Sequence, residues 1–167
     1  MIIPYGYMFD NENVTLPLPN YSVGKNGINT PDDVMLVQFL MKRFFEINQW
    51  KVYKPAGTFK VDGSCGPKTR AWILAVQNAL TKHYPVATDG RISTPALSSK
   101  AWDAFLHYTI IVMCKELHRD RPGFFPCEDY SDVNVTFPPE DMPPLLTQSL
   151  KIAWSMLDHA AYEEQAA

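Results

Sequence analysis

The chain has 167 residues, 46% of them hydrophobic and 20% charged, which is enough apolar material to bury one core and excludes a disordered protein. Its 18 acidic and 15 basic residues give a formal net charge of −3, and this lack of basic charge argues against nucleic acid as a partner. No apolar run approaches the roughly 20 residues that cross a bilayer, so no membrane span is expected, and three unevenly spaced cysteines do not indicate a disulfide framework.

Residues 1–29 are expected to form an extended N-terminal arm. They alternate aromatic, polar and proline residues without a sustained helical period, and residues 13–18 favour a short strand. The first residues lack the basic region, apolar run and cleavage site of a signal peptide. We therefore expect synthesis in the cytoplasm, and a route other than standard export if the protein meets a cell wall.

A helix is predicted over residues 31–47. Thr30 provides a capping hydroxyl, Pro31 suits the first helical position and Asp33 supplies an acid in the first turn. Lys42 and Arg43 are expected to face water. The predicted buried side has the three-and-four spacing of a core-facing helix and consists of Val34, Val37, Leu40, Met41, Phe44 and Phe45.

Residues 61–77 form the most informative segment, in which a tight turn leads directly into a second helix over residues 67–82. Asp62-Gly63 allows the backbone to reverse with a positive φ. Gly66-Pro67 follows, and Pro67 suits the first helical position because its ring fixes φ at about −65°. The helix carries an apolar stripe made of Trp72, Ile73, Val76 and Leu80.

A third helix of about 20 residues is predicted after a second Asp-Gly pair, Asp89-Gly90, with Thr94-Pro95 or Ser98-Ser99 as its cap. It ends at Arg121-Pro122-Gly123. Its apolar positions are Trp102, Phe105, Leu106, Thr109, Ile110, Met113 and Leu117.

A last helix is predicted over residues 143–162, after a connection rich in proline and aromatic residues. We expect it to pack on the rest of the module or on another chain. One side of it is apolar and consists of Leu146, Leu150, Ala153, Leu157 and Ala160. The expected organisation is thus an arm (1–29), a helical module (30–120), a connection (121–142) and a C-terminal helix (143–167).

The pattern Asp-Gly-x-x-Gly-Pro-x-Thr, followed by an apolar helix that ends in Gln, resembles the signature of the peptidoglycan-binding-domain-like family. These are small three-helix modules attached to cell-wall hydrolases. The matching motif residues are Asp62, Gly63, Gly66, Pro67, Thr69 and Gln77. The family's first-helix signature is matched by Val34, Val37, Gln38 and Met41. The resemblance covers about residues 31–110, and it departs from the family pattern at Cys65, Trp72 and Val76, so the core must be repacked.

The resemblance implies a mainly α fold, a three-helix bundle here extended by the arm, a lengthened third helix and the C-terminal helix. It also implies attachment to peptidoglycan through a shallow groove. Trp50, Tyr53 and Phe59, in the loop before the motif, are candidates for contacts with sugar or muropeptide; alternatively they cover the open side of a small core. Lys68 and Arg70 are candidates for a stem-peptide carboxylate, or else form a solvated helix face.

Candidates for catalysis and metal binding are weaker. Cys65 lies next to a helix N-terminus, which lowers a thiol pKa, but no histidine lies near it in sequence, and a structural role is the simpler interpretation. His107, Cys114 and His118 are spaced along one predicted helix face, and Cys127 could approach them as a further zinc ligand. Packed cysteine and hydrogen-bonded histidines are the alternative, and no metal or cofactor is predicted.

Adjacent carboxylates also fail to suggest an active site. The pairs Asp32-Asp33, Glu128-Asp129 and Glu140-Asp141 lie in predicted caps or loops, where acids cap helices and solvate turns. The sequence contains no His-Glu-x-x-His zinc motif and no stretch like that of the L,D-transpeptidases.

Three functional hypotheses remain. The first is a non-enzymatic peptidoglycan-binding module, the wall-attaching part of a larger assembly. The second is a structural subunit of a phage neck or tail, or of a contractile injection machine, that reuses the fold, contacts other subunits through its arm and last helix, and reaches the cell envelope that way. The third is a wall hydrolase whose catalytic residues are not recognisable.

Overall fold

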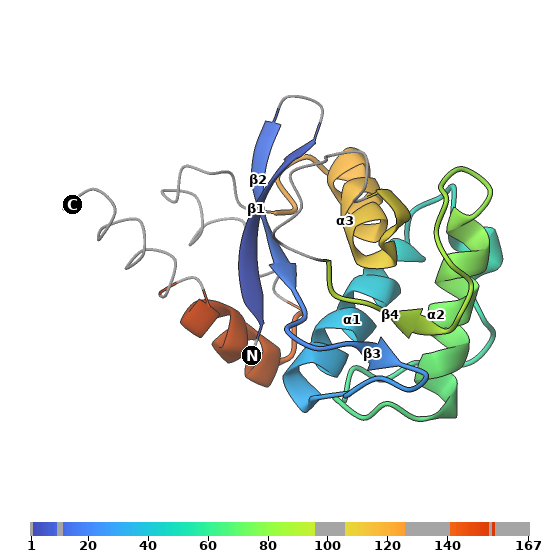
Figure 1. Cartoon of the computed structure of the whole chain (residues 1–167), viewed down its shortest axis with the longest axis horizontal. Coiled ribbons are helices and arrows are strands. Elements are labelled where there is room, and N and C mark those ends of the chain that lie inside the picture. The colour runs from blue at the N-terminus through green and yellow to red at the C-terminus, as the bar shows by residue number, and fades with distance from the viewer. Residues whose placement is uncertain (1, 10–11, 96–105, 126–140, 154, 156–167) are drawn as a thin grey trace.

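Three helices that contact one another form the centre of this mostly helical structure. They are α1 (Pro31–Phe44), α2 (Pro67–Leu80) and α3 (Thr109–Asp120), and the short 3-10 helix η1 (Lys51–Tyr53) follows α1. The computed structural model describes residues 2–9, 12–95, 106–125, 141–153 and 155 (Figure 1). Another helix covers residues 144–153.

The predicted start of the first helix is confirmed, but the cap is used differently from the expectation. Thr30 is the N-cap and Pro31 the first helical residue, yet the Thr30 hydroxyl makes no capping hydrogen bond and instead donates to Asp33 Oδ2. The buried Asp33 carboxylate also accepts the N–H groups of Asn20 and Tyr21, each at 3.0 Å. Asp33 therefore fastens the preceding loop to the first turn of α1.

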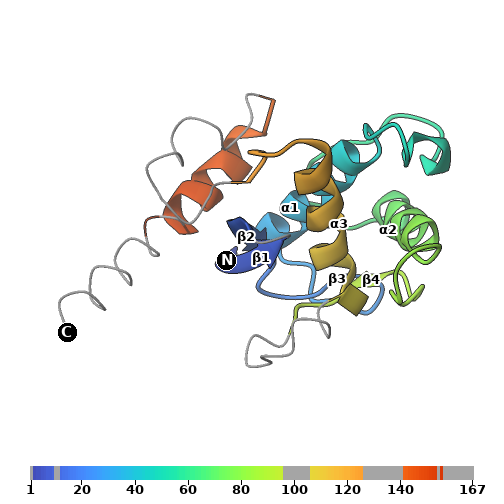
Figure 2. The same ribbon diagram turned by 90° about the horizontal axis from the view of Figure 1, so that it is seen from above.

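The N-terminal arm is a β-hairpin rather than a single extended segment. Strand β1 (Ile3–Phe9) pairs antiparallel with β2 (Glu12–Leu18), from Ile3 opposite Leu18 to Phe9 opposite Glu12. Both views place the hairpin between α3 and helix 144–153 (Figures 1 and 2). With neighbours on both sides, β2 is buried along its length from residue 14 to residue 18, so the hairpin contributes to the core.

A second, two-residue sheet joins distant parts of the chain. Strand β3 (Val23–Gly24) pairs antiparallel with β4 (Arg91–Ile92), which follows α2. Gly24 has a φ of 111°, and a Cβ there would lie 2.3 Å from the carbonyl oxygen of Gly90. Only glycine allows the two strands to approach this closely.

The third helix begins later than predicted. Its N-cap is Tyr108, in an extended conformation, and α3 has 12 residues, fewer than the about 20 predicted. At the start of the helix, the Thr109 hydroxyl accepts a hydrogen bond from Gln77 Nε2. The predicted positions Trp102 and Phe105 and the Ser98-Ser99 cap lie outside the described residues.

The C-terminal helix is confirmed over residues 144–153. Leu146, Leu150 and Ala153 on its predicted apolar side are buried in the same hydrophobic cluster as the three central helices. The helix therefore packs on its own chain, which was one of the two alternatives. The predicted positions Leu157 and Ala160 lie outside the described residues.

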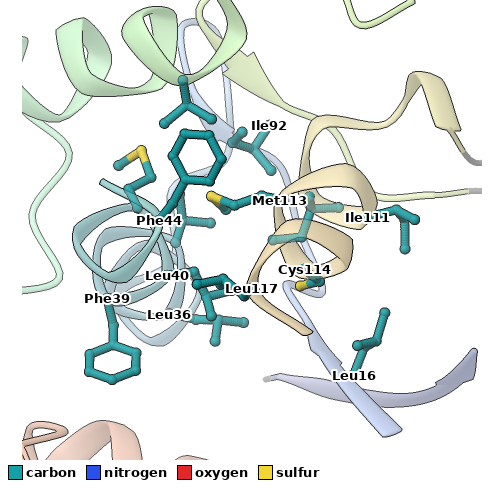
Figure 3. Packing of buried hydrophobic residues seen from close by; sticks show 14 of the residues in the cluster. Leu16, Leu36, Phe39, Leu40, Phe44, Ile92, Ile111, Met113, Cys114 and Leu117 are labelled. Atoms are coloured by element: carbon teal, nitrogen blue, oxygen red, sulfur yellow. The ribbon is translucent and has the colours of Figure 1, made fainter. Parts of the chain in front are cut away.

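The core lies mainly between α1 and α3. Leu36, Leu40 and Phe44 of α1 point toward Met113 and Leu117 of α3 (Figure 3). All six predicted core positions of the first helix are buried, as is the whole Trp72 to Leu80 stripe of α2. Hydrophobic periodicity thus predicted the buried faces of these two helices correctly.

Two buried glutamines join the helices to the Asp-Gly turns. Gln38 Nε2 donates to Asp62 Oδ1, the Ser64 carbonyl and Thr69 Oγ1 at 2.9–3.1 Å, while Gln38 Oε1 accepts the N–H groups of Asp62 and Gly63. The five hydrogen bonds connect α1, the turn and α2. Gly63 has a φ of 78°, and a Cβ there would meet the Pro31 carbonyl at 3.0 Å, so this turn requires glycine.

Gln77 repeats this arrangement one helix later. Its Nε2 donates to Asp89 Oδ1, the Arg91 carbonyl and Thr109 Oγ1, and its Oε1 accepts the Gly90 N–H at 2.8 Å. In both cases the aspartate Oδ1 also accepts the N–H two residues further along the chain. The chain therefore contains two glutamine joints of the same design, one between α1 and α2 and one between α2 and α3.

Replacing Gln38 with alanine should strongly destabilise the fold. Gln38→Ala leaves the buried Gly63 N–H without its acceptor and opens a cavity, and we expect a loss of about 3 kcal/mol in the free energy of unfolding. Urea denaturation followed by circular dichroism measures this. Gln148→Ala, on the exposed side of helix 144–153, is the matched control and should change stability by less than about 0.5 kcal/mol. Equal losses in the two variants would contradict the structural role of Gln38.

Candidate ligand groove

A groove lies beside the first glutamine joint and consists of two adjoining depressions. The larger, of about 440 Å³, lies between α1, the segment 59–62 and the start of the C-terminal element. Its walls include Phe39, Lys42 and Arg43 of α1, with Asp141 and Pro143 opposite. Figure 3 shows Phe39 pointing away from α3, on the side of α1 that lines the groove.

The smaller depression, of about 240 Å³, continues from the first along the segment 58–62. The two share Phe59, Lys60 and Asp62. Its far wall is the beginning of α2, where Lys68 lies, and Gln38 and Thr69 form part of its lining. The hydrogen bonds of the first joint therefore also shape this end of the groove.

The rim of the groove is cationic. Lys42, Lys60 and Lys68 are exposed, and none of them forms an ion pair within the described part of the chain. This fits an uneven charge distribution, because residues 42–70 contain seven of the 15 basic residues but only two of the 18 acidic ones. The segment has a formal charge of +5 in a chain whose net charge is −3. A concentration of one charge sign in a concave site attracts ligands of the opposite sign.

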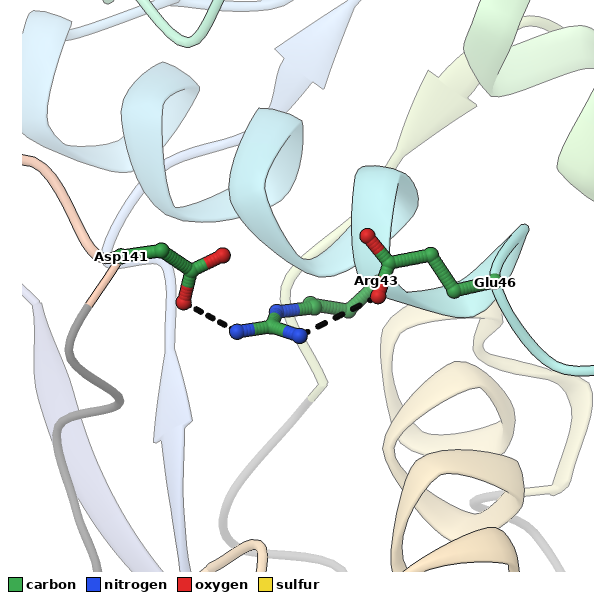
Figure 4. A network of polar contacts seen from close by, with 3 residues as sticks. All are labelled: Arg43, Glu46 and Asp141. Carbon is green, nitrogen blue, oxygen red and sulfur yellow. Dashed lines mark hydrogen bonds and ion pairs between the residues drawn. The ribbon is translucent and has the colours of Figure 1, made fainter.

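Arg43 is held in place in the wall of the groove. Its guanidinium lies 5.6 Å from the centre of the Phe39 ring and pairs with Glu46 at 3.1 Å and with Asp141 (Figure 4). The side chain is only 16% exposed, which corrects the expectation that it faces water. Because Asp141 is distant in sequence, this ion pair attaches the C-terminal element to α1.

Asp62 lies where the two depressions meet. The Ser64 N–H donates to its Oδ1 and lowers the pKa of this carboxyl below 3.8, with a smaller contribution from Gln38 and despite opposing desolvation. Asp62 is therefore ionised at neutral pH, and the cationic groove has one fixed negative charge at its centre.

The structure does not expose the predicted aromatic contacts. Trp50 is 1% exposed and stacks on Phe44 with ring centres 5.4 Å apart. Phe59 is 8% exposed and stacks on Trp72 at 4.0 Å, so it reaches the groove floor while one ring face is already covered. Trp50 and Phe59 therefore cover the core, the alternative role considered for them. Tyr53 is half-buried, and Lys82 Nζ lies 5.3 Å from its ring centre.

The two predicted cations on α2 differ in position. Both Lys68 and Arg70 are exposed, but only Lys68 lines the groove. The motif residues Asp62, Gly66, Pro67 and Thr69 also line the smaller depression, and the joint residue Gln77 does not.

The cysteine and histidine candidates are not brought together. His107 is exposed and precedes the first residue of α3, whereas Cys114 and His118 are buried within it, so the three do not share one helix face. Burial raises the pKa of the Cys114 thiol. The described residues contain no group of three or more potential metal ligands, and Cys127 lies outside them. Cys65 is half-buried at the turn before α2.

Sequence reasoning missed Lys42, Arg43 and Lys60 as site residues. Lys42 and Arg43 were assigned to a solvated face, and Lys60 carried no motif. The excess of basic residues between positions 42 and 70 was the available signal. It was hidden by the slightly negative charge of the whole chain.

Comparison with models of protein families, with curated proteins and with solved structures gives no match for this chain. Within the described residues, no helix combines the length and the apolar character that crossing a membrane requires.

The pKa of Asp62 predicts an acid-dependent contribution to stability. Because its pKa in the folded protein is lower than in the unfolded chain, this contribution is present above about pH 3.8 and is lost as the pH falls through the lower folded value. Asp62→Asn should therefore be less stable than the native protein at about pH 7, and the gap should narrow at about pH 3. Urea denaturation of both proteins at both pH values measures this difference in the free energy of unfolding. A difference of the same size at the two pH values would contradict the prediction.

Proposed function

We propose that this protein is a non-enzymatic peptidoglycan-binding module that attaches a larger assembly to a cell wall. Three mutually contacting helices, joined by two Asp-Gly turns, support the peptidoglycan-binding-domain-like three-helix bundle to which the sequence motifs point. The hairpin and helix 144–153 are additions to that bundle. They pack against it and leave the groove beside the first joint open.

The groove is the observation that carries the proposal. Its two depressions together offer an elongated, open site next to the motif turn, with three exposed ammonium groups along it. Peptidoglycan is a polymer with regularly repeated carboxylates, so an elongated cationic groove is complementary to it in shape and charge.

A binding role without catalysis is supported by the chemistry of the described side chains. The thiol of Cys114 is buried with a raised pKa, which disfavours the nucleophilic thiolate. The acids of the groove are occupied, since Asp62 accepts hydrogen bonds from Gln38 and Ser64 and Asp141 pairs with Arg43. The pKa of the Asp62 carboxyl is lowered, which disfavours a role for this group as a general acid.

The second candidate is a structural subunit of a phage or injection-machine assembly. Helix 144–153 buries one side on the chain and exposes Leu145 (67%) and Ile152 (49%) on another. These residues are seven positions apart and so lie on the same helical face. Two large apolar side chains on one exposed face favour contact with another subunit.

Binding to purified insoluble peptidoglycan tests the first candidate. We expect the protein to sediment with peptidoglycan at low salt, and the sedimented fraction to fall as salt screens the lysines. Incubation with labelled wall should release no soluble fragments. Sedimentation with an insoluble neutral polysaccharide is the control for trapping. Protein that stays in the supernatant at low salt would exclude the wall-binding function, and released fragments would show a hydrolase.

Mass measurement in solution tests the second candidate. An assembly subunit should form species larger than the 19.0 kDa chain, and replacing Leu145 and Ile152 with glutamine should shift the mass toward that of the monomer. Val52→Gln is the matched control, because Val52 is also strongly exposed but lies on η1. A strict monomer at high concentration would count against this candidate and leave the first one unaffected.

A further inference from the structure

We propose that the groove recognises the peptide stems of peptidoglycan through their carboxylates and leaves the sugar rings of the glycan strand uncontacted. This inference rests on the proposed function and specifies which part of the polymer is bound. Recognition of a glycan depends largely on exposed aromatic faces and recognition of a peptide stem on charged groups, and the described groove provides the charged groups.

Sugar rings are bound largely through stacking on exposed aromatic faces, and the groove does not offer such faces. Phe59 is stacked on Trp72 and 8% exposed, and Phe39 is 2% exposed and lies against the Arg43 guanidinium. Trp50 is buried and does not line either depression. The aromatic rings near the groove are therefore already occupied by contacts within the protein.

The groove carries separated, exposed charges along its length. Lys42 lines the larger depression, Lys68 the smaller, and Lys60 both, so three ammonium groups follow the groove along its length. A peptide stem carries carboxylates at more than one position along an extended backbone. Ammonium groups that form no ion pair in the described structure are available to bind these carboxylates without first breaking an internal pair.

The negative charges in the groove argue for a peptide over a phosphate polymer. Asp62 and Asp141 lie among the lysines, and both would repel a chain that carries only phosphodiesters. A stem that contains a diamino acid carries an ammonium group as well as carboxylates. Asp62, at the meeting point of the two depressions, accepts its hydrogen bonds from Gln38 and Ser64 at Oδ1, and its Oδ2 is placed to accept that ammonium group.

Three preparations of the same sacculi test the inference with the full chain. Intact sacculi are compared with sacculi treated with hydrofluoric acid, which removes phosphodiester polymers, and an amidase digest of the same sacculi supplies soluble peptide stems and soluble glycan strands as separate competitors. Binding to sacculi should persist after hydrofluoric acid treatment, and the released stems, but not the released glycan strands, should displace the protein from intact sacculi. Lys42→Gln, Lys60→Gln and Lys68→Gln should each weaken binding to intact sacculi by about three- to tenfold.

The control variant is Lys54→Gln, an exposed lysine of the same basic segment that does not line the groove. It should leave binding unchanged within about twofold. Circular dichroism should show all four variants folded, since each replaces an exposed side chain.

The outcomes separate the two proposals. Displacement from intact sacculi by the glycan strands and not by the peptide stems would keep the wall-binding function and overturn recognition of the peptide. Loss of binding after hydrofluoric acid treatment would overturn recognition of the peptide in favour of a phosphate polymer. Equal losses of binding in Lys54→Gln and in the groove variants would overturn the groove as the binding site. No binding to any preparation would overturn the proposed function and this inference together.

Discussion

Gln38 and Gln77 each join two helices and an Asp-Gly turn, and the arrangement of the central helices depends on these two joints. A primary amide suits this position because it donates and accepts at the same point, so one side chain satisfies both a carbonyl group of the turn and the N–H of its buried glycine. An aliphatic residue of equal size would leave those groups unpaired at a cost of about 1–3 kcal/mol each. The helices are thus fixed in register by polar contacts within an apolar core.

The first joint also explains why a groove forms where it does. Gln38 holds the turn at Asp62 and Gly63 against α1 and holds Thr69 at the start of α2. The segment 58–62 leads into that turn, so its course is fixed at one end, and the two depressions follow it. In the described structure the second joint lacks only a counterpart of the Asp62 N–H bond, but Arg91 leads from its turn into the small sheet with β3. The same local design therefore supports a groove at one joint and strand pairing at the other.

Features encoded locally could be predicted from the sequence. The starts of α1 and α2 follow from Pro31 and Pro67, and their buried faces from apolar spacing. The hairpin was missed because Pro4 and Pro17, which lie opposite each other in it, interrupt the alternation typical of strands. The late start of α3 was missed because the apolar spacing runs on across Tyr108, where the backbone is extended, and the hydrogen bond from Gln77 to Thr109 joins residues 32 apart, beyond any local pattern.

The candidate site was less predictable because it depends on the tertiary structure. Lys42 and Lys60 come to line the same larger depression because the chain returns along α1 after η1. Phe59 is covered because it stacks on Trp72. The motif residues are largely buried or bonded within the joints, whereas the lysines that border the groove are exposed and take no part in them. Substitutions at the lysines can therefore change the ligand without disturbing the fold. This separation explains why the motif indicates the architecture more firmly than the ligand, and why the ligand has to be inferred from the charges of the groove.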